Sequence, residues 1–314
     1  MSSAAPITVP MRADHRRRRV AARLALILLA GLLAVYLGIS ALAANLLTVP
    51  QRALSAQTPA AYGVAYQDVR FPARTDGISI AGWYLPSAGS RKAVVLVHGW
   101  NSSRTNEFQG RFPAFAAALQ RRGLAVLMID LRGHGASGDA HFSFGLTERR
   151  DLEGAVDWLK GQGFQPGSIG VLGVSMGAAA GIGAAADDTD IGALVEDCSF
   201  AEIYPLIERE WANQTPLPAV FLPSTVLMGR IMFGYTIWDA RPIDQIGMIA
   251  PRPILIIHGG ADTFTPPEHG RQLHAAAPDA EYWEVPGAGH AHSYAADPAA
   301  YVDRVASFFE RSLK

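Results

Sequence analysis

The sequence predicts a doubly wound α/β fold, in which a parallel sheet carries helices on both faces, preceded by one membrane-spanning helix. Strand-like and helix-like segments alternate from about residue 63 to the end of the chain, a pattern typical of this fold class. Residues 94–97 and 254–257 are apolar at every position, as strands buried between two helix layers must be. Residues 24–44 contain no charged side chain, which indicates a separate apolar helix before the α/β domain.

The N-terminal segment divides into a basic part, residues 1–23, and an apolar part, residues 24–47. As an α-helix rising about 1.5 Å per residue, the uncharged stretch would cross the roughly 30 Å hydrocarbon core of a bilayer. Four arginines at 16–19 precede it and should stay in the cytoplasm, because basic residues beside a span are retained on that side. We therefore expect a single-pass signal anchor in the cell membrane, with the following domain on the extracytoplasmic side.

A cleaved signal peptide is the alternative interpretation of this segment. Ala41-Leu42-Ala43 resembles a processing site, and cleavage near Ala43 would release a secreted domain. The uncharged stretch is longer than the roughly 7–15 apolar residues of most secretory signals, which favours the anchor. Residues 48–62, with two prolines and several small or polar side chains, are expected to link the membrane to one domain at residues 63–314.

Charge and cysteine content exclude several classes of function. The formal net charge is −1, and residues 1–23 hold six of the 27 basic and one of the 28 acidic side chains, so the rest of the chain is acidic. We therefore expect no nucleic-acid partner. Cys198 is the only cysteine, so no intrachain disulfide can form, and no paired Cys or His spacing predicts a zinc site. Cys198 itself is interpreted as a small buried residue.

The alternation assigns the elements in chain order. Strands are expected at residues 63–71, 79–85, 93–97, 125–129, 168–174, 193–195, 254–257 and 282–285. Helices are expected at residues 107–121, 147–160, 176–186 and 298–313.

The stretch Gly173-Val174-Ser175-Met176-Gly177 joins the predicted strand 168–174 to the predicted helix 176–186. A serine on so sharp a turn has a strained backbone, and larger side chains two residues away would collide there, which glycine avoids. The turn exposes the hydroxyl above the sheet, and the helix directs its free N–H groups toward the reacting oxygen. This context predicts that Ser175 is a nucleophile rather than an inert serine in a glycine-rich turn.

A serine hydroxyl needs a base in hydrogen-bond reach and a third group that orients this base. His290 follows the predicted strand 282–285, and Asp262 follows the strand 254–257. Both should therefore emerge at the carboxyl edge of the sheet, where open α/β sheets build their sites, and the order Ser, Asp, His is typical of this architecture. The alternatives are residues of the same types nearby, namely His292 for the base and Asp279, Asp297 and Asp303 for the acid.

Two backbone N–H groups are expected to stabilise the negative oxygen that forms when a carbonyl becomes tetrahedral. Met176, directly after the nucleophile, supplies one of them. The other should come from Trp100, because His98-Gly99-Trp100 turns the chain after the strand 93–97 and the glycine permits a close backbone approach. His98 is expected to brace this loop by hydrogen bonding rather than to titrate in catalysis.

Taken together and in order, these motifs resemble the α/β-hydrolase superfamily over residues 63–309, particularly bacterial serine hydrolases of the dienelactone-hydrolase and serine-aminopeptidase-like branches. The likeness rests on five stretches, namely residues 98–100, 130–138 and 173–177, the loop of Asp262, and Gly289-His290. The resemblance implies an eight-stranded, mostly parallel sheet and a triad of Ser175, Asp262 and His290. It also implies hydrolysis through an acyl-enzyme without a metal or an organic cofactor. Serine at the nucleophile position argues against the dehalogenase and epoxide hydrolase relatives, which carry aspartate there.

Residues 130–138 contain an aspartate, an arginine and a histidine, and they are interpreted as a tight turn with an Arg–Asp pair that braces the site. Residues 200–251 interrupt the alternation with aromatic, methionine and proline side chains. They are expected either to form a cap, with helices at 201–211 and 224–233 around an apolar acyl pocket, or to pack as an ordinary crossover.

The sequence thus predicts a membrane-anchored serine hydrolase that cleaves small-molecule carboxylic esters. A peptidase or amidase and an acyltransferase with the same triad remain alternatives, because the pocket decides which acyl compound is attacked. A catalytically silent binding module at the cell surface is a further alternative.

Overall fold

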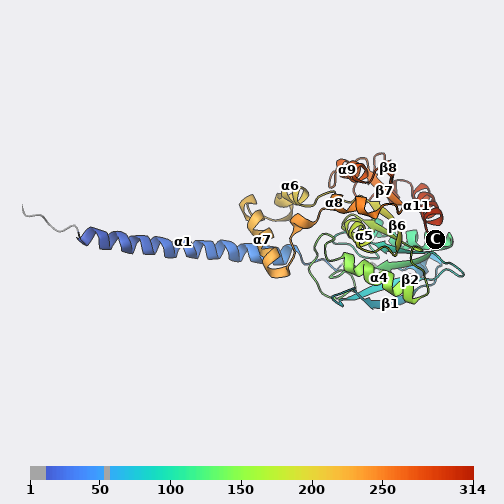
Figure 1. Ribbon diagram of the computed structural model, residues 1–314, viewed down its shortest axis with the longest axis horizontal. Helices are drawn as coiled ribbons and strands as arrows, with labels where there is room; N and C mark the ends of the chain where they lie inside the picture. Colours follow the sequence, from blue (N-terminus) through green and yellow to red (C-terminus); the bar gives the residue numbers. More distant parts are fainter. Residues whose placement is uncertain (1–11, 53–56) are drawn as a thin grey trace, which may run out of the picture.

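The computed structural model describes residues 12–52 and 57–314, in which strands and helices alternate around one sheet (Figure 1). The strands are β1 (Gln67–Pro72), β2 (Ser79–Leu85), β3 (Ala93–Val97), β4 (Ala125–Ile129), β5 (Ile169–Val174), β6 (Ile191–Asp197), β7 (Ile254–Gly259) and β8 (Glu281–Val285). The α-helices are α1 (Arg12–Leu47), α2 (Glu107–Gly110), α3 (Phe112–Arg121), α4 (Arg149–Gly161), α5 (Met176–Asp187), α6 (Tyr204–Gln214), α7 (Leu222–Phe233), α8 (Ile243–Ile246), α9 (Glu268–Ala276), α10 (Ser293–Ala296) and α11 (Pro298–Ser312). Short 3-10 turns cover η1 (Pro59–Tyr62), η2 (Ala219–Phe221), η3 (Ile237–Asp239) and η4 (Gly247–Ile249).

The strands form one sheet in the order β1-β2-β4-β3-β5-β6-β7-β8. The pairs β1–β2 and β2–β4 are antiparallel, and every other pair is parallel. The predicted eight-stranded, mostly parallel sheet is therefore confirmed. Because β3 to β8 run in the same direction, their carboxyl ends meet at one edge of the sheet, where loops from different strands can build a common site.

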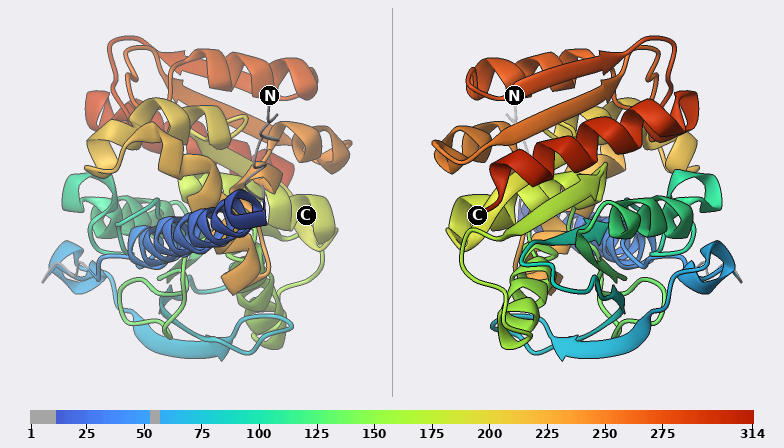
Figure 2. Two further views of the ribbon diagram at one scale, coloured as in Figure 1. Left: turned by 90° about the vertical axis from the view of Figure 1, so that its left-hand side faces the viewer. Right: turned by 90° about the vertical axis from the view of Figure 1, so that its right-hand side faces the viewer.

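The central strands bury both of their faces. Along β7, Ile254 and Ile256 pack into the apolar cluster under α4, α5 and α9, whereas Leu255 and Ile257 pack into the cluster under α3 and α11. This alternation follows from the two-residue period of a strand. The helix layers on either side of the strands are visible in the end views of Figure 2. Burial between two layers explains the continuous apolar runs seen in the sequence.

The single helix predicted for residues 107–121 is broken into α2 and α3. Phe108 and Gln109 have φ values of 53° and 55°, which a continuous right-handed helix excludes. Phe108 is fully buried and packs against four other aromatic rings. Pro113 then stands in the first turn of α3, where proline is favoured. Burial of the aromatic ring therefore outweighs the local preference for one continuous helix.

Other boundaries differ by a few residues. β1 begins at Gln67 rather than at residue 63, because residues 59–62 form a 3-10 turn that ends at Gly63. α9 is missing from the sequence prediction, because only Gly270 and Leu273 of this helix are buried. A helix with so narrow an apolar stripe gives a weak periodic signal.

The N-terminal helix α1 starts before the predicted span and is 36 residues long. Its residues His15–Leu47 are long and apolar enough to cross a membrane, a property that a signal sequence shares. The helix projects from the α/β domain, and its C-terminal part packs against α7 (Figure 1). Residues 1–11 of the predicted basic segment lie outside the described residues.

The described part of the expected linker lies against the domain. Thr48 Oγ1 is 2.8 Å from His141 Nδ1, and the carbonyl of Thr48 accepts the N–H of Phe142 at 3.0 Å. Arg52 donates to two carbonyls of the loop 130–138 at 2.8 and 2.9 Å. Residues 53–56 of this linker are outside the described residues. The end of α1 is thus tied to the domain by hydrogen bonds.

Candidate active site

Ser175 occupies the turn between β5 and α5 with φ 54° and ψ −118°, a conformation that side-chain-bearing residues rarely adopt. A Cβ on Gly173 would lie 2.2 Å from Gly177 O, and a Cβ on Gly177 would lie 2.4 Å from His98 O. Both positions therefore need glycine, because the obstructing atoms belong to the backbone. The N–H of Ser175 donates to Asp197 O at 2.8 Å, which ties the turn to β6.

His290 lies between Ser175 and Asp262 at the carboxyl edge of the sheet. Its Nε2 is 2.9 Å from Ser175 Oγ, and its Nδ1 is 2.7 Å from Asp262 Oδ2. The second oxygen of this carboxylate accepts the N–H groups of Phe264 and Thr265 at 2.9 and 2.8 Å. With Nδ1 donating to the carboxylate, Nε2 presents its lone pair to the serine hydroxyl and can accept its proton. The geometry is that of a base held between an alcohol and an acid.

The alternative base and acids make their contacts elsewhere. His292 and Asp279 are exposed to solvent. Asp297 accepts a backbone N–H at the start of α11, and Asp303 forms a surface ion pair with Arg122. In the described residues, 12–52 and 57–314, no hydrogen bond or ion pair joins any of these four side chains to Ser175.

The loop after β3 lies directly against Ser175. A Cβ on Gly99 would lie 3.1 Å from Ser175 Cβ, so the glycine permits the close approach. In the described part of the chain, the N–H groups of Trp100 and Met176 donate no hydrogen bond. Met176 is the first residue of α5, where N–H groups lack an acceptor within the helix. Both N–H groups are therefore available to a negatively charged oxygen beside the serine.

Glu107, which the sequence prediction misses, holds this loop in place. Its Oε2 accepts the N–H of Gly99 at 2.7 Å, and its side chain is buried. Burial raises the pKa of Glu107, while hydrogen bonds from the N–H groups of Gly99 and Phe108 lower it. No motif marks an acid at this distance from the glycine, so a single sequence gave no signal for this contact.

His98 braces the same loop, as predicted. Its Nε2 accepts the N–H of Leu131 at 3.0 Å, and its Nδ1 donates to Gly99 O at 2.8 Å. Burial lowers the pKa of His98 well below its usual value, which keeps the ring neutral. A neutral ring can donate at one nitrogen and accept at the other, as this pair of contacts requires.

The Arg–Asp pair predicted within residues 130–138 does not form, because each of the two side chains pairs with a residue outside this segment. Asp130 pairs with Arg104 at 2.7 Å, and Arg132 pairs with Asp151 at 2.7 Å. The turn is so tight that a Cβ on Gly135 would lie 2.1 Å from Asp130 Oδ2. Asp130 therefore points into the turn, whereas Arg132 leaves it toward α4. Hydrogen bonds from Ala136 N–H and Ser137 Oγ to Asp130 hold the turn itself, while the two ion pairs tie it to neighbouring elements.

Two buried acids lie at the end of β6, beneath the turn of Ser175. Asp197 accepts hydrogen bonds from Ser293 Oγ at 3.0 Å and from Tyr301 OH at 2.9 Å. Burial raises the pKa of Asp197 to about 7 and that of Glu196 to about 8. Glu196 Oε2 accepts a backbone N–H, but its Oε1 has no partner among the described residues. These acids are also absent from the sequence prediction.

Cys198 follows these acids and is fully buried, as predicted. Among the described residues, Cys198, Asp262 and His290 form one group whose possible metal-ligand atoms lie within 4.8 Å of one another. The carboxylate and the imidazole of this group already hydrogen-bond to each other. Burial raises the pKa of the Cys198 thiol well above its usual value, so the thiolate form is disfavoured here.

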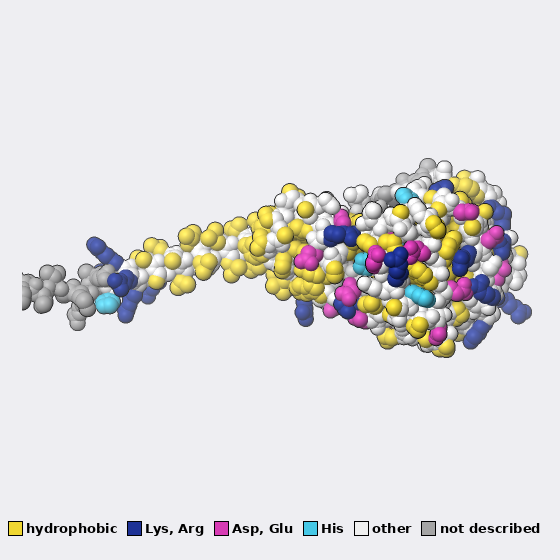
Figure 3. All heavy atoms as spheres, turned by 90° about the horizontal axis from the view of Figure 1, so that it is seen from above, with side chains coloured by type: hydrophobic (Ala, Val, Ile, Leu, Met, Phe, Trp, Pro, Cys, Tyr) yellow, Lys and Arg dark blue, Asp and Glu magenta, His cyan; other side chains and the backbone are white. Residues whose placement is uncertain are grey.

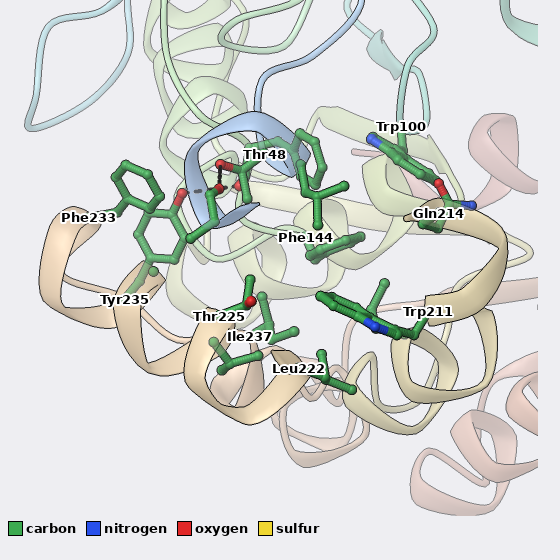
Figure 4. A pocket seen from close by; sticks show the side chains of 16 residues that line it. Thr48, Trp100, Phe144, Trp211, Gln214, Leu222, Thr225, Phe233, Tyr235 and Ile237 are labelled. Atoms are coloured by element: carbon green, nitrogen blue, oxygen red, sulfur yellow. Dashed lines mark hydrogen bonds between the residues drawn. The ribbon is translucent and has the colours of Figure 1, made fainter. Parts of the chain in front are cut away.

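An apolar pocket of about 720 Å³, counting its open mouth, lies between the loop of Trp100, the segment 200–251 and the end of α1 (Figure 4). Phe144, Trp211 and Leu222 contribute to its lining. The two helices expected at 201–211 and 224–233 are α6 and α7, and both line it. A lining made mostly of apolar side chains is typical of small-molecule sites.

Comparison with known proteins reveals similarity over most of this domain. A family model described as the Alpha/beta hydrolase family matches residues 94–304. An uncharacterized protein of Mycobacterium tuberculosis is 30% identical over 237 residues, which cover 74% of this chain and 75% of that protein. The matched family region contains Trp100, Ser175, Asp262 and His290.

Two characterised proteins are also similar. The esterase Pf2001 of Pyrococcus furiosus has a TM-score of 0.68 and 26% identity, and the match covers 84% of this chain and 99% of that one. A thiohydrolase of Aspergillus aculeatus is 31% identical over 204 residues, covering 62% of this chain and 60% of that protein.

Proposed function

The chain belongs to the alpha/beta hydrolase family, and from this premise we propose that it is a serine hydrolase that cleaves carboxylic esters through an acyl-enzyme on Ser175. The hydrogen bonds from His290 to Ser175 and to Asp262 are the observation that carries the proposal. The similarity to the Pyrococcus furiosus esterase supports an ester as the substrate.

In the proposed reaction, Ser175 Oγ attacks the ester carbonyl carbon while His290 Nε2 takes the hydroxyl proton. Asp262 holds the imidazole in the required tautomer and stabilises the imidazolium that forms. The carbon–oxygen bond of the ester then breaks, and His290 returns the proton to the departing alcohol. Water attacks the acyl-enzyme with His290 again as base, which releases the acid and restores Ser175.

The N–H groups of Trp100 and Met176 are the proposed donors to the carbonyl oxygen as it becomes negative. Their lack of other acceptors in the described structure supports this role. Donors fixed in the backbone need no reorganisation during the reaction, and the loss of one such donor typically slows catalysis by about 10²–10³-fold.

We also propose that residues 24–47 anchor the enzyme in the cell membrane as a single-pass signal anchor. Residues 1–23 would lie in the cytoplasm and the domain at 63–314 outside it, because the arginines precede the span. Cleavage near Ala43 is the alternative. The burial of Ser40 and Ala43, which are 0% and 7% exposed, supports retention, because cleavage after Ala43 would remove these packed side chains.

A thioester is the second candidate substrate. The thiohydrolase of Aspergillus aculeatus is among the similar proteins, and the same nucleophile, base and oxyanion donors can attack a thioester carbonyl. Hydrolysis of an amide requires the same nucleophile, base and oxyanion donors. A series of peptides or anilides should therefore be assayed beside the esters and thioesters.

The substitution Ser175→Ala tests the proposal. It should lower kcat/KM for acetyl esters by at least about 10⁴-fold, because no other group replaces the attacking oxygen. The matched control is Ser90→Ala, in the loop between β2 and β3, which should leave hydrolysis unchanged. A membrane-impermeant fluorophosphonate should label Ser175 on intact spheroplasts if the domain lies outside. Unchanged ester hydrolysis in the Ser175→Ala variant would contradict the mechanism, and labelling only after lysis would contradict the orientation.

A further inference from the structure

The last turn of α1 forms one wall of the apolar pocket. Ala44, Leu47 and Thr48 line it from this side, across from Leu222 and other side chains of α7. Figure 4 shows Thr48 on the turn of α1, with Leu222 on α7 at the other side of the space. The helix that the sequence assigns to the membrane is therefore also a structural part of the pocket.

Trp100 belongs both to the pocket lining and to the candidate active site. This residue follows Gly99, whose Cβ would lie 3.1 Å from Ser175 Cβ, and its own N–H is a proposed oxyanion donor. Trp100 Nε1 is also buried and has no partner among the described residues. Trp100 is therefore the residue at which the pocket and the candidate active site adjoin.

Specific contacts hold residues 219–233, which comprise η2 and α7 and which we call the cap, against α1. Tyr36 OH donates to Val220 O at 2.6 Å, and Ser40 Oγ lies 2.8 Å from Ser224 Oγ. The ring centroids of Tyr36 and Phe221 are 4.8 Å apart. Tyr36 precedes the pocket residue Ala44 by eight positions, which is about 12 Å along a helix. The cap therefore reaches a level well inside the uncharged stretch of α1.

The outer surface of the cap is apolar at the same level. Val220, Leu227, Ile231 and Met232 are 65%, 43%, 66% and 45% exposed. Figure 3 shows hydrophobic side chains covering α1 and continuing onto this part of the molecule. A contiguous apolar surface of this kind marks a contact with a membrane or another protein. Its continuity with a membrane-spanning helix indicates that lipid covers it.

We propose that the pocket between α1 and α7 binds the long acyl chain of an ester drawn from the bilayer, with the cap seated in the outer leaflet. The proposal rests on the proposed function, because Ser175 must cleave the bound ester. The carbonyl lies beside Ser175 and Trp100, and the chain lies against Ala44 and Leu222. A long-chain ester dissolved in water shares this chemistry, so the source of the ester needs its own experiment.

A photoreactive probe tests where the chain lies. The full-length protein in phosphatidylcholine vesicles is treated with a long-chain alkyl fluorophosphonate that carries a diazirine near the chain end. Ser175 Oγ displaces fluoride from phosphorus while His290 takes its proton, so a P–O bond replaces the P–F bond. Illumination then expels N₂, and the carbene inserts into a nearby C–H bond. After trypsin digestion, we expect cross-links to the peptides 24–52 and 210–230, which contain the pocket residues Ala44 and Leu222 against which the chain is proposed to lie.

Cross-links that appear only in other peptides would overturn the proposed chain position. Cross-links to residues 24–52 in the mature protein would also require that α1 is retained. Absence of any labelling of Ser175 by fluorophosphonates would instead contradict the proposed function, so the two failures can be told apart.

Two substitutions that fill the pocket provide an independent test. Ala44→Leu adds bulk from α1, and Gly229→Leu adds bulk from α7, where a Cβ would meet no heavy atom within 4 Å. The matched controls are Ala34→Leu and Gly38→Leu, which stand on the exposed surface of α1. Each pocket variant should lower the ratio of kcat/KM for decanoyl and acetyl esters at least about tenfold, the effect of losing contacts for about two methylene groups. The controls should keep the ratio of the original protein.

Labelling of Ser175 by a short-chain fluorophosphonate confirms that each variant is folded. Ratios that stay unchanged in both pocket variants, whatever happens to the individual rates, would overturn the proposal. If the original protein cleaves neither ester, the proposed function fails instead.

The vesicle that holds the ester identifies its source. An ester with two long chains, which does not leave its vesicle during the assay, is placed either in the vesicles that carry the protein or in separate protein-free vesicles, at the same total amount. Hydrolysis should be confined to the first arrangement if the pocket draws the ester from its own bilayer. Equal rates in the two arrangements would overturn the membrane source.

Discussion

The turn around Ser175 and the pocket between α1 and α7 are held by different kinds of contact. At the turn, a Cβ on Gly177 would lie 2.4 Å from a backbone oxygen, and the side chain of Ser175 meets His290 at 2.9 Å. In the pocket, a Cβ on Gly229 would meet no heavy atom within 4 Å. Its walls are mostly apolar side chains from separate segments. Backbone atoms therefore constrain the first region, whereas side chains and open space define the second.

This difference separates the reaction from the choice of substrate. A change at the turn displaces the attacking oxygen relative to its base and its oxyanion donors, so it should reduce the rate for every ester. A change in the pocket alters the space for the acyl chain, so it should act on the preference for chain length.

The substitution Gly177→Ala should have the largest effect. Its methyl group would collide with the carbonyl of His98, which belongs to the loop of the proposed oxyanion donor. We expect a loss of stability on the order of 2–4 kcal/mol and a fall in acetyl ester kcat on the order of 10²-fold, because the loop and the serine separate. Thermal unfolding and steady-state kinetics measure the two quantities.

Gly229→Ala is the matched comparison in the cap helix. Alanine is favoured over glycine inside a helix by up to about 1 kcal/mol, and a Cβ at this position meets open space. The unfolding temperature of this variant should stay equal or rise slightly. Equal destabilisation by the two substitutions would remove the distinction between a constrained turn and an open pocket.

Substitutions of Glu107 should have the next largest effect. In Glu107→Ala, the N–H of Gly99 loses its acceptor at 2.7 Å, and the loop of Trp100 loses its position. We expect kcat to fall by about 10–100-fold with little change in KM, because the loop contributes mainly in the transition state. Glu107→Gln keeps an acceptor oxygen and should recover most of the rate. A loss in KM alone, or equal losses in the two variants, would contradict this positioning role.

Much of the turn could be predicted from the sequence because its requirements are local. Gly173 and Gly177 stand at fixed offsets from Ser175. The collision that requires Gly173 involves the backbone of Gly177 in the same segment, whereas Gly177 faces the carbonyl of His98 in the loop after β3. His290 and Asp262 follow strands whose apolar runs are recognisable, so their arrival at one edge follows from the parallel sheet.

The remaining contacts depend on distances that one sequence does not encode locally. Glu107 reaches Gly99 from the start of α2, directly before the residues that interrupt the predicted helix. Asp197 meets Tyr301 across more than a hundred positions. The pocket joins α1 to α7, and the types of residue that line it from either helix do not indicate that the two helices are neighbours. Tertiary packing determines such contacts, and no sequence periodicity or motif predicts them.

Substitution of Glu196, the buried acid beneath the turn of Ser175, should have the smallest effect, a change in how stability depends on pH. Burial raises its pKa to about 8 from an ordinary value of 4.5. Between these values the native state binds a proton that the unfolded state releases, so the free energy of unfolding falls as pH rises. Glu196→Gln cannot ionise and should remove on the order of 1 kcal/mol from the difference in stability between about pH 5 and about pH 8.

Unfolding temperatures of the two proteins at both pH values provide the measurement, and the matched control is Glu208→Gln on the exposed surface of α6. The control should keep the pH dependence of the original protein, because it changes an exposed side chain and leaves the buried acids in place. A Glu196→Gln variant whose stability still falls as steeply with pH would show that another group, with Asp197 as the first candidate, carries the titration beneath Ser175. Asp151, whose pKa burial also raises to about 7, would be the next candidate, whereas the pocket lining contains no carboxylate that could titrate in this range.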